Sequence, residues 1–266
     1  MTRAIVLRAA GTNCDRETVL ALERAGAQTE LLHLNRVIAE PQRLDDVALV
    51  VIAGGFSHGD DIAAGRIFGL DVRYRLGNAL RSFADRGGAI LGVCNGFQVL
   101  VDTGLLEPGH ERAQREVALT GNDPGLYQCR WVTLKEEDCA CTWLEPGQLL
   151  PCPIAHGEGR IAVKDPAILE RWIQNRQVAL RYVARDGSPA NGYPENPNGS
   201  IADIAGLCDP TGRILGLMPH PERNIDPWQD PEWTRHEPRA EGAGLSFYRR
   251  LVEFAESGST HPAPTH

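Results

Sequence analysis

The sequence has no apolar run that approaches the length of a membrane span, and it has no stripe rich in lysine and arginine. Its 27 basic and 35 acidic residues give a formal net charge of −8. These features argue against a membrane protein and against nucleic acid as a principal partner. Residues 1–7 enter an expected strand with no apolar signal segment before it, so we expect a cytoplasmic protein.

Patterns typical of disulfides and of zinc are missing as well. Seven cysteines are an odd number, and without an export signal we expect them to be reduced. Cys129, Cys139, Cys141 and Cys152 occur in one region, but their spacings give neither two Cys-x-x-Cys pairs nor a Cys/His pair of the zinc type. We therefore expect ordinary thiols there and no metal ligands in the chain.

The chain also lacks a nucleotide-binding loop. It contains no Gly-x-x-x-x-Gly-Lys-Ser/Thr, and no convincing Gly-x-Gly-x-x-Gly follows a strand, so we expect no bound cofactor. Asp60 and Asp61 could hold magnesium as a carboxylate pair. An acidic loop that faces solvent or a partner is the stronger expectation for them.

The alternation of apolar strand patterns with helical patterns predicts an α/β fold. We expect an open, mostly parallel, doubly wound sheet flanked by helices, with additional short strands in the C-terminal half. One domain over residues 1–256 and a disordered tail over 257–266 fit the length. The expected strands are 4–8, 28–34, 47–53, 89–93, 130–134, 178–183, 201–208 and 213–218. The expected helices are 16–25, 74–85, 95–103, 166–174 and 245–256.

One motif carries most of the functional information, an apolar run that ends in Gly92-Val93-Cys94-Asn95-Gly96. It predicts a strand, a sharp turn and a helix, with the turn raising a thiol as a nucleophile elbow does. Flanking glycines let the turn close, and the helix N-terminus favours a thiolate. A cysteine in such a place is more often a small core residue, so this motif alone makes Cys94 only a candidate nucleophile.

A second motif, Pro219-His220-Pro221-Glu222, supplies the groups that a thiol nucleophile needs. The two prolines predict an extended segment, in which His220 and Glu222 would face the same way. An imidazole that takes the thiol proton and a carboxylate that orients the imidazole complete an acyl-transfer triad. The joint occurrence of both motifs makes a solvated surface turn a poor explanation for the second.

Six segments in this order resemble the triad class (class I) of glutamine amidotransferases, and more narrowly the glutaminase subunits of phosphoribosylformylglycinamidine synthase. They are residues 11–15 (GTNCD), 54–60 (GGFSHGD), 92–98 (GVCNGFQ), 155–160 (AHGEGR), 198–200 (NGS) and 218–223 (MPHPER). The resemblance implies a flavodoxin-like amidotransferase fold. It also implies hydrolysis of glutamine through a Cys94 thioester, with His220 and Glu222 as catalytic partners.

The resemblance further implies an ATP-dependent synthetase subunit as partner, which uses the ammonia to make formylglycinamidine ribonucleotide in purine biosynthesis. ATP and Mg²⁺ would bind to that partner, and a small bridging subunit is left open. Gln98 would contact glutamine, and His156 with Gly157 would hold its α-amino acid end. His156 as a structural loop histidine is an equal alternative.

Backbone N–H groups at Asn95 and in the Gly54-Gly55 loop are the natural oxyanion hole, since glycine permits close approach. Two other functions stay open at this point. One is a glutaminase or another cysteine hydrolase that serves a different synthetase, and the other is an inactive regulatory module. An inactive copy should have lost a triad residue, whereas this sequence keeps all three.

Overall fold

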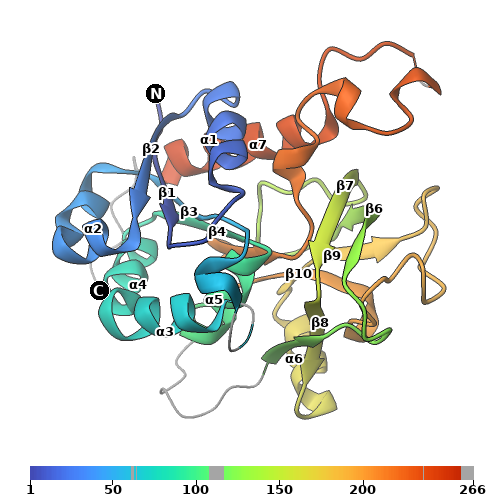
Figure 1. The fold of residues 1–266 in the computed structure, drawn as a ribbon, viewed down its shortest axis with the longest axis horizontal. Helices are drawn as coiled ribbons and strands as arrows, with labels where there is room; N and C mark the ends of the chain where they lie inside the picture. The colour runs from blue at the N-terminus through green and yellow to red at the C-terminus, as the bar shows by residue number, and fades with distance from the viewer. Residues whose placement is uncertain (61–62, 64, 108–116, 236, 259–266) are drawn as a thin grey trace.

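The computed structural model of the protein describes residues 1–60, 63, 65–107, 117–235 and 237–258. A nine-stranded sheet runs through it in the order β2-β1-β3-β4-β11-β10-β9-β6-β7 (Figure 1). Its strands are β1 (Arg3–Arg8), β2 (Gln28–His33), β3 (Leu49–Ile52), β4 (Ala89–Val93), β6 (Gln128–Glu136), β7 (Leu149–His156), β9 (Val178–Val183), β10 (Ile204–Cys208) and β11 (Ile214–Leu217). A separate pair consists of β5 (Val117–Gly121) and β8 (Glu158–Val163).

One half of the sheet is parallel. Strands β2, β1, β3, β4 and β11 pair in parallel, and every residue of β3, β4 and β11 is buried. Burial on both faces explains why these segments are runs of Val, Ile and Leu rather than alternating patterns. The helices are α1 (Asp15–Arg24), α2 (Leu34–Ala39), α3 (Arg66–Arg75), α4 (Gly77–Asp85), α5 (Asn95–Thr103), α6 (Pro166–Gln174) and α7 (Ala243–Gly258).

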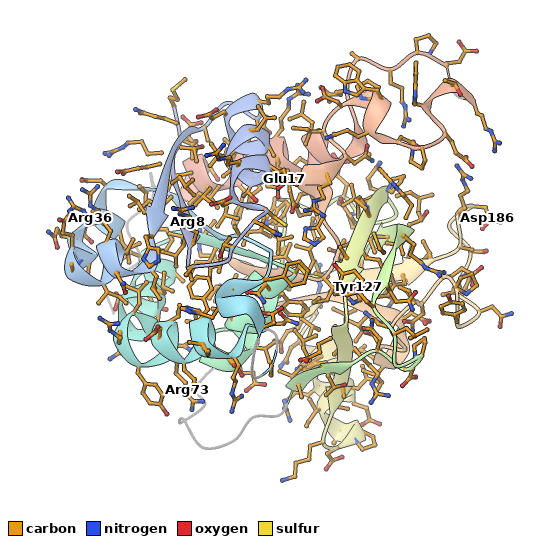
Figure 2. The ribbon with its side chains drawn as sticks, in the orientation of Figure 1. Arg8, Glu17, Arg36, Arg73, Tyr127 and Asp186 are labelled. Carbon is orange, nitrogen blue, oxygen red and sulfur yellow. The ribbon has the colours of Figure 1, made fainter. Side chains whose placement is uncertain are left out.

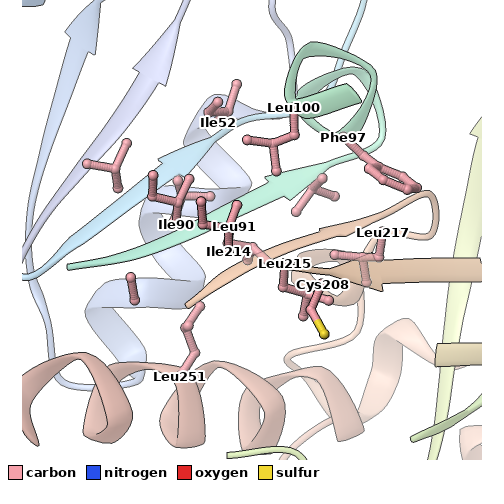
Figure 3. Packing of buried hydrophobic residues seen from close by; sticks show 14 of the residues in the cluster. Ile52, Ile90, Leu91, Phe97, Leu100, Cys208, Ile214, Leu215, Leu217 and Leu251 are labelled. Carbon is pink, nitrogen blue, oxygen red and sulfur yellow. The ribbon is translucent and has the colours of Figure 1, made fainter. Parts of the chain in front are cut away.

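Helices cover both faces of the parallel half. Figure 3 shows Phe97 and Leu100 of α5 on one face of β4 and β11, and Leu251 of α7 on the opposite face. Helix α3 packs beside α5, and α1 packs beside α7. The predicted α/β fold with a doubly wound sheet is confirmed.

The other half of the sheet is antiparallel, as β10, β9, β6 and β7 continue outward from β11. These are the additional C-terminal strands. The expected strand over 201–208 is wrong at its start, because residues 201–203 form a short 3-10 turn. Ala202 and Asp203 have φ of 50° and 57°, which strand backbone does not permit.

The expected helix over 74–85 is also wrong, because two helices occupy this region. The chain leaves helical geometry at Leu76 (φ −130°), between α3 and α4.

Helix α7 runs to Gly258, so the first two residues of the expected tail are helical, and 259–266 lie outside the described residues. The single-domain expectation stays a prediction. Among the residues that the structure describes, no helix is both long and apolar enough to cross a membrane.

Candidate active site

The sheet topology brings Cys94 and His220 together. Strands β4 and β11 are parallel neighbours, with Val93 opposite Leu217, so both end at the same edge of the sheet. The backbone N–H of Cys94, one residue after β4, donates to the carbonyl of Leu217 at 2.7 Å. His220 follows β11 by three residues, and its N–H donates to the carbonyl of Pro153 in β7 at 2.9 Å. Open α/β sheets bind their ligands at this edge.

Cys94 occupies the strained turn that the sequence predicts. Its φ of 51° and ψ of −107° lie in a region that non-glycine residues rarely adopt. Tight packing holds it there, since a Cβ on Gly96 would lie 2.0 Å from the carbonyl oxygen of Ile52. A Cβ on Gly92 would lie 2.6 Å from the carbonyl oxygen of Gly96. Both glycines therefore let α5 begin directly against β3 and β4.

His220 and Glu222 form a buried pair, with Nδ1 of His220 2.6 Å from Oε1 of Glu222 and each residue 1% exposed. Burial acts to lower the pKa of His220. The charges on Glu222 and Cys94 outweigh burial and raise that pKa well above its usual value. The imidazole therefore favours the protonated form, which is the state that a thiolate–imidazolium pair requires.

The predicted extended backbone at this motif is wrong beyond His220. Residues Pro221–Arg223 form a 3-10 turn, for which proline is well suited at the first position. His220 itself is extended, with φ −112° and ψ 83°. The ring and the carboxylate still meet, because the turn brings Glu222 back beside the imidazole.

The Gly54-Gly55 loop lies directly against the catalytic pair. A Cβ on Gly54 would be 2.9 Å from Cε1 of His220 and 3.3 Å from Cβ of Cys94. Gly55 has φ of 125°, and a Cβ there would lie 2.5 Å from the backbone nitrogen of Asn13. Only glycine fits both positions, as expected for a loop that presents its backbone to a substrate.

A second thiol, Cys14, reaches the same site, and the sequence analysis gave it no role. Its Sγ lies within 4.8 Å of ligand atoms of His220 and Glu222, and Nη2 of Arg223 donates to it at 3.1 Å. Burial raises the pKa of Cys14, and the contact with His220 offsets only part of that rise. The signal for it was the GTNCD segment, because Cys14 follows β1 at the same edge of the sheet.

Cys14, His220 and Glu222 are close enough together to be considered as metal ligands. Each is already engaged, His220 with Glu222 at 2.6 Å and Cys14 with Arg223 at 3.1 Å. The guanidinium of Arg223 beside Cys14 would repel a cation. The arrangement fits proton transfer better than metal binding.

Tyr248 of α7 is a further residue that the sequence analysis missed. Its hydroxyl lies 3.4 Å from Oε2 of Glu222, and its side chain is fully buried. Burial, together with the nearby Glu222 charge, raises the pKa of Tyr248 well above its usual value, so the hydroxyl stays protonated and donates to the carboxylate. A tyrosine on an amphipathic helix gives no sequence signal for such a contact, since core packing explains it equally well.

Asn95 and Gln98 form a buried amide network under the cleft. Nδ2 of Asn95 donates to Oε1 of Gln98 at 3.1 Å and to Oδ1 of Asp60 at 3.0 Å. Nε2 of Gln98 donates to the carbonyl of Glu158 at 2.6 Å. Asp60 is half-buried and its carboxylate holds Asn95, and the expectation that this acidic loop faces solvent or a partner stays a prediction. Asp61 lies outside the described residues.

His156 is hydrogen-bonded at one ring nitrogen, and the other is buried without a protein partner. Asn122 donates from Nδ2 to the carbonyl of His156 at 2.9 Å, so its Oδ1 accepts from Nδ1 of the ring at 3.1 Å. Burial, and then the charge of His220, lower the pKa of His156 to about 4. Nε2 of this neutral ring is buried and has no protein partner. The carbonyl of Gly157 accepts from the N–H of Asn122 at 2.9 Å.

These groups surround one cleft. Its lining contains seven of the nine residues predicted from the sequence, while Gly54 and Glu222 lie just behind it. Phe56 and Tyr127 are stacked at the rim with ring centroids 6.3 Å apart, and Figure 2 shows Tyr127 between α5 and the antiparallel strands. The lining residues are Asn13, Cys14, Gly55, Phe56, Asp60, Cys94, Asn95, Gln98, Tyr127, Ala155, His156, Gly157, Glu158, His220 and Arg223.

A buried cysteine on a strained strand-to-helix turn, facing a histidine–carboxylate pair at the edge of a parallel sheet, defines a cysteine-dependent acyl-transfer enzyme. Over residues 1–255 the sequence matches the CobB/CobQ-like glutamine amidotransferase domain, and the chain belongs to this family.

Its relatives narrow the family further. It is 39% identical over 254 residues to the phosphoribosylformylglycinamidine synthase subunit PurQ of Dehalococcoides mccartyi, covering 95% of this chain and 97% of that one. It is 42% identical over 264 residues to the subunit of the same name from Methanococcus maripaludis, with the same coverage.

Solved structures agree with this placement. A chain in the structure of PurLQS from Thermotoga maritima is 31% identical, with a TM-score of 0.70 and coverage of 96% of this chain and 99% of that one. A glutamine amidotransferase from Methylobacillus flagellatus is 13% identical with a TM-score of 0.52, covering 100% of this chain and 97% of that one. At that identity the second likeness shows the fold alone.

Proposed function

We propose that this chain is the glutaminase subunit of phosphoribosylformylglycinamidine synthase, which releases ammonia from glutamine for use by a synthetase subunit. The observation that carries the chemistry is the placement of Cys94 on its strained turn against the buried His220–Glu222 pair. The names of the relatives supply the reaction that the ammonia serves.

The first chemical step is attack of the Cys94 thiolate on the side-chain carboxamide carbon of glutamine. His220 holds the thiol proton, and Glu222 stabilises the resulting imidazolium and fixes its orientation. The carbonyl π electrons move to oxygen and form a tetrahedral oxyanion. Backbone N–H groups at Asn95 and Gly55, which both line the cleft, are the proposed donors to it. Each such donor contributes about 3 kcal/mol to transition-state stabilisation.

The second step breaks the carbon–nitrogen bond. His220 returns its proton to the leaving nitrogen, ammonia departs and a glutamyl thioester remains on Cys94. Water, deprotonated by His220, attacks the thioester and releases glutamate and the free thiolate. His156 lines the cleft, and its unpartnered Nε2 is the proposed acceptor for the α-ammonium group of glutamine, because a neutral imidazole nitrogen accepts a hydrogen bond. Gln98 lines the cleft and is the proposed contact to glutamine, because its amide bonds to Asn95 and to the carbonyl of Glu158 leave one N–H free to donate.

Released ammonia is mostly protonated in water, so the reaction calls for a coupled acceptor site. We propose an ATP-dependent synthetase subunit as partner, with ATP and Mg²⁺ bound there, and leave a bridging subunit open. The solved PurLQS assembly that contains the similar chain supports a partner of this kind. A cytoplasmic location suits the seven free cysteines, since none of them pairs in a disulfide.

Covalent labelling tests the proposal. The full-length chain, with the synthetase partner also supplied, is treated with a glutamine-mimicking electrophile, and each cysteine is scored by peptide mass spectrometry. We expect labelling at Cys94 that excess glutamine blocks, and none at Cys14, which lines the same cleft. Absence of labelling would favour an inactive module, and labelling that glutamine does not block would favour a different cysteine hydrolase.

A further inference from the structure

Three thiols form a cluster away from the catalytic cleft, and the proposed reaction makes no use of them. Cys139 and Cys141 lie in the loop between β6 and β7, and Cys208 ends β10. Their Sγ atoms all lie within 4.8 Å of one another, and the residues are 4%, 1% and 0% exposed. Figure 3 shows the sulfur of Cys208 projecting from β10 on the side of the sheet where α7 packs.

Backbone contacts fix this cluster from both sides. The N–H of Ala140, between the first two cysteines, donates to the carbonyl of Arg176 at 2.7 Å. The N–H of Cys208 donates to the carbonyl of the next residue, Gln177, at 2.8 Å. A Cβ on Gly212 would lie 2.0 Å from the carbonyl oxygen of Ala140, so the two loops are in close contact. The three sulfurs therefore converge because the main chain places them there.

We infer that Cys139, Cys141 and Cys208 form a three-thiolate site for Zn²⁺. Zinc–sulfur bonds of about 2.3 Å in tetrahedral geometry set sulfur atoms about 3.8 Å apart, so closure from 4.8 Å or less requires shifts of at most about 1 Å. Binding releases the thiol protons, and each sulfur gives an electron pair to the metal.

Charge favours a divalent ion over Cu⁺, the other common thiolate-bound ion. Three thiolates carry three negative charges. Binding of Zn²⁺ reduces the net charge of the site to −1, whereas binding of Cu⁺ reduces it only to −2, and a net charge in a buried site is costly. Backbone carbonyls of Gln177 and Arg176 lie 3.5 and 3.7 Å from Sγ of Cys208. In the metal-free state these carbonyls accept the thiol hydrogen that metal binding removes.

Ordinary thiols are the expectation from the sequence, and of the four cysteines that occur in one region only Cys139 and Cys141 belong to the cluster. Cys129 is exposed on β6, and Cys152 is buried in β7 with its Sγ 3.7 Å from the carbonyl of Leu150. Neither belongs to the cluster. The third member, Cys208, comes from a strand far along the chain, so local spacing gives no sign of the site.

Metal titration of the full-length chain tests the inference. Reduced protein, stripped with a chelator, is titrated with Zn²⁺ against a competing chromogenic chelator, and with Cd²⁺ as a spectroscopic substitute. We expect one equivalent per chain. Cys139→Ser, Cys141→Ser and Cys208→Ser should each weaken Zn²⁺ binding at least tenfold, by analogy with the loss of a structural ligand. Cys129→Ser is the matched control and should bind as the wild type does.

A second control separates this site from the catalytic cleft, where Cys14, His220 and Glu222 form the other compact ligand group in the described part of the chain. Cys14→Ser should keep the full equivalent of metal. Cadmium NMR of the wild type should show a shift typical of three sulfur ligands, and this readout does not depend on whether the serine variants fold.

Two kinds of result would overturn the site. The first is absence of Zn²⁺ binding by the reduced wild type, including the case in which it binds only Cu⁺. The second is equal loss of binding in Cys129→Ser or Cys14→Ser. The test is independent of the proposed reaction, because labelling of Cys94 by the electrophile is measured separately.

Discussion

The hydroxyl of Tyr248 donates to Oε2 of Glu222 at 3.4 Å, while Nδ1 of His220 lies 2.6 Å from the other carboxylate oxygen. Helix α7 and the turn after β11 thus hold the carboxylate from two sides. Because Glu222 orients the imidazole, the C-terminal helix contributes to the geometry of a site whose nucleophile lies on the turn between β4 and α5. Tyr248 is a positioning residue, since it acts on the reaction only through Glu222.

The variant Tyr248→Phe removes this hydroxyl and keeps the ring that packs against Phe247 at 5.6 Å. One hydrogen bond to a charged group contributes about 1 kcal/mol or somewhat more, so we expect kcat for glutamine hydrolysis to fall roughly fivefold with KM unchanged. Steady-state glutamate release measures it, and thermal unfolding checks the fold. An unchanged kcat would show that Glu222 does not depend on α7.

Glu222→Gln keeps the shape of the side chain and removes its charge. The pKa of His220 should fall towards its usual value, because burial then acts with less opposition from negative charge. We expect thioester formation to slow by roughly 10²- to 10⁴-fold, as when a triad carboxylate is neutralised. Rapid-mixing measurement of electrophile labelling at Cys94 reports this step. Glu23→Gln, at an exposed position of α1, is the control, and equal rates in the two variants would remove Glu222 from the triad.

Local sequence predicts the parts of this site that depend on local geometry. The elbow at Cys94 follows from an apolar strand and flanking glycines, and the pairing of His220 with Glu222 follows from their spacing, although the turn between them does not. The GTNCD segment is a signal for Cys14, but the contacts of Cys14 with Arg223 and of Tyr248 with Glu222 could not be predicted, because they join segments more than twenty residues apart that only the folded sheet brings together.

Fold prediction failed in a similar way. A helical pattern continues through Leu76, and the one local sign of the break is Gly77 directly after it, a residue that commonly follows a helix end. The residues with left-handed backbone at 202 and 203 are alanine and aspartate, and neither indicates a positive φ in the sequence as glycine would. Parallel strands were easier to predict, since burial on both faces gives them uninterrupted apolar runs.

The two cleft cysteines should behave differently when each is replaced. Cys94→Ala in the complex with the synthetase should abolish glutamine-dependent synthesis and keep synthesis from added ammonium, because only the ammonia supply is lost. Cys14→Ser should keep more than a tenth of the glutamine-dependent rate, since burial keeps the Cys14 thiol protonated and unreactive. Both rates are measured from the same purified complexes. Loss of ammonium-dependent synthesis in Cys94→Ala would point to a structural role for the elbow.

Gly54→Ala tests the fit of the oxyanion loop. The added methyl would stand 2.9 Å from Cε1 of His220 and 3.3 Å from Cβ of Cys94, so it must push the two catalytic groups apart. We expect kcat/KM to fall roughly 100-fold, because displacements of about 1 Å cost that much in positioned reactions. Gly121→Ala, where a Cβ meets nothing within 4 Å and φ is not positive, is the matched control. Equal activity in both variants would contradict the close approach of this loop.

The neutral state of His156 makes a prediction about stability and pH. Its folded pKa of about 4 lies below the usual 6.5, so the unfolded chain binds more protons at acidic pH. The contribution of His156 to folding is therefore fully present above pH 6.5 and is lost as the pH falls towards 4. Linkage gives a loss of about 2 kcal/mol by about pH 5.

His156→Gln isolates this effect, because glutamine does not titrate and can still bond to Asn122. Between about pH 7.5 and about pH 5, the free energy of unfolding of the wild type should fall by about 2 kcal/mol more than that of the variant. The raised pKa of His220 has the opposite sign and stabilises the fold at acidic pH, but it is present in both proteins and largely cancels in the comparison. Urea unfolding at the two pH values measures the difference. Equal losses would mean that the pKa of His156 is not lowered by folding, so that its ring is protonated near pH 5 in the folded protein and Nε2 is then a donor at that pH, unsuited to an α-ammonium group.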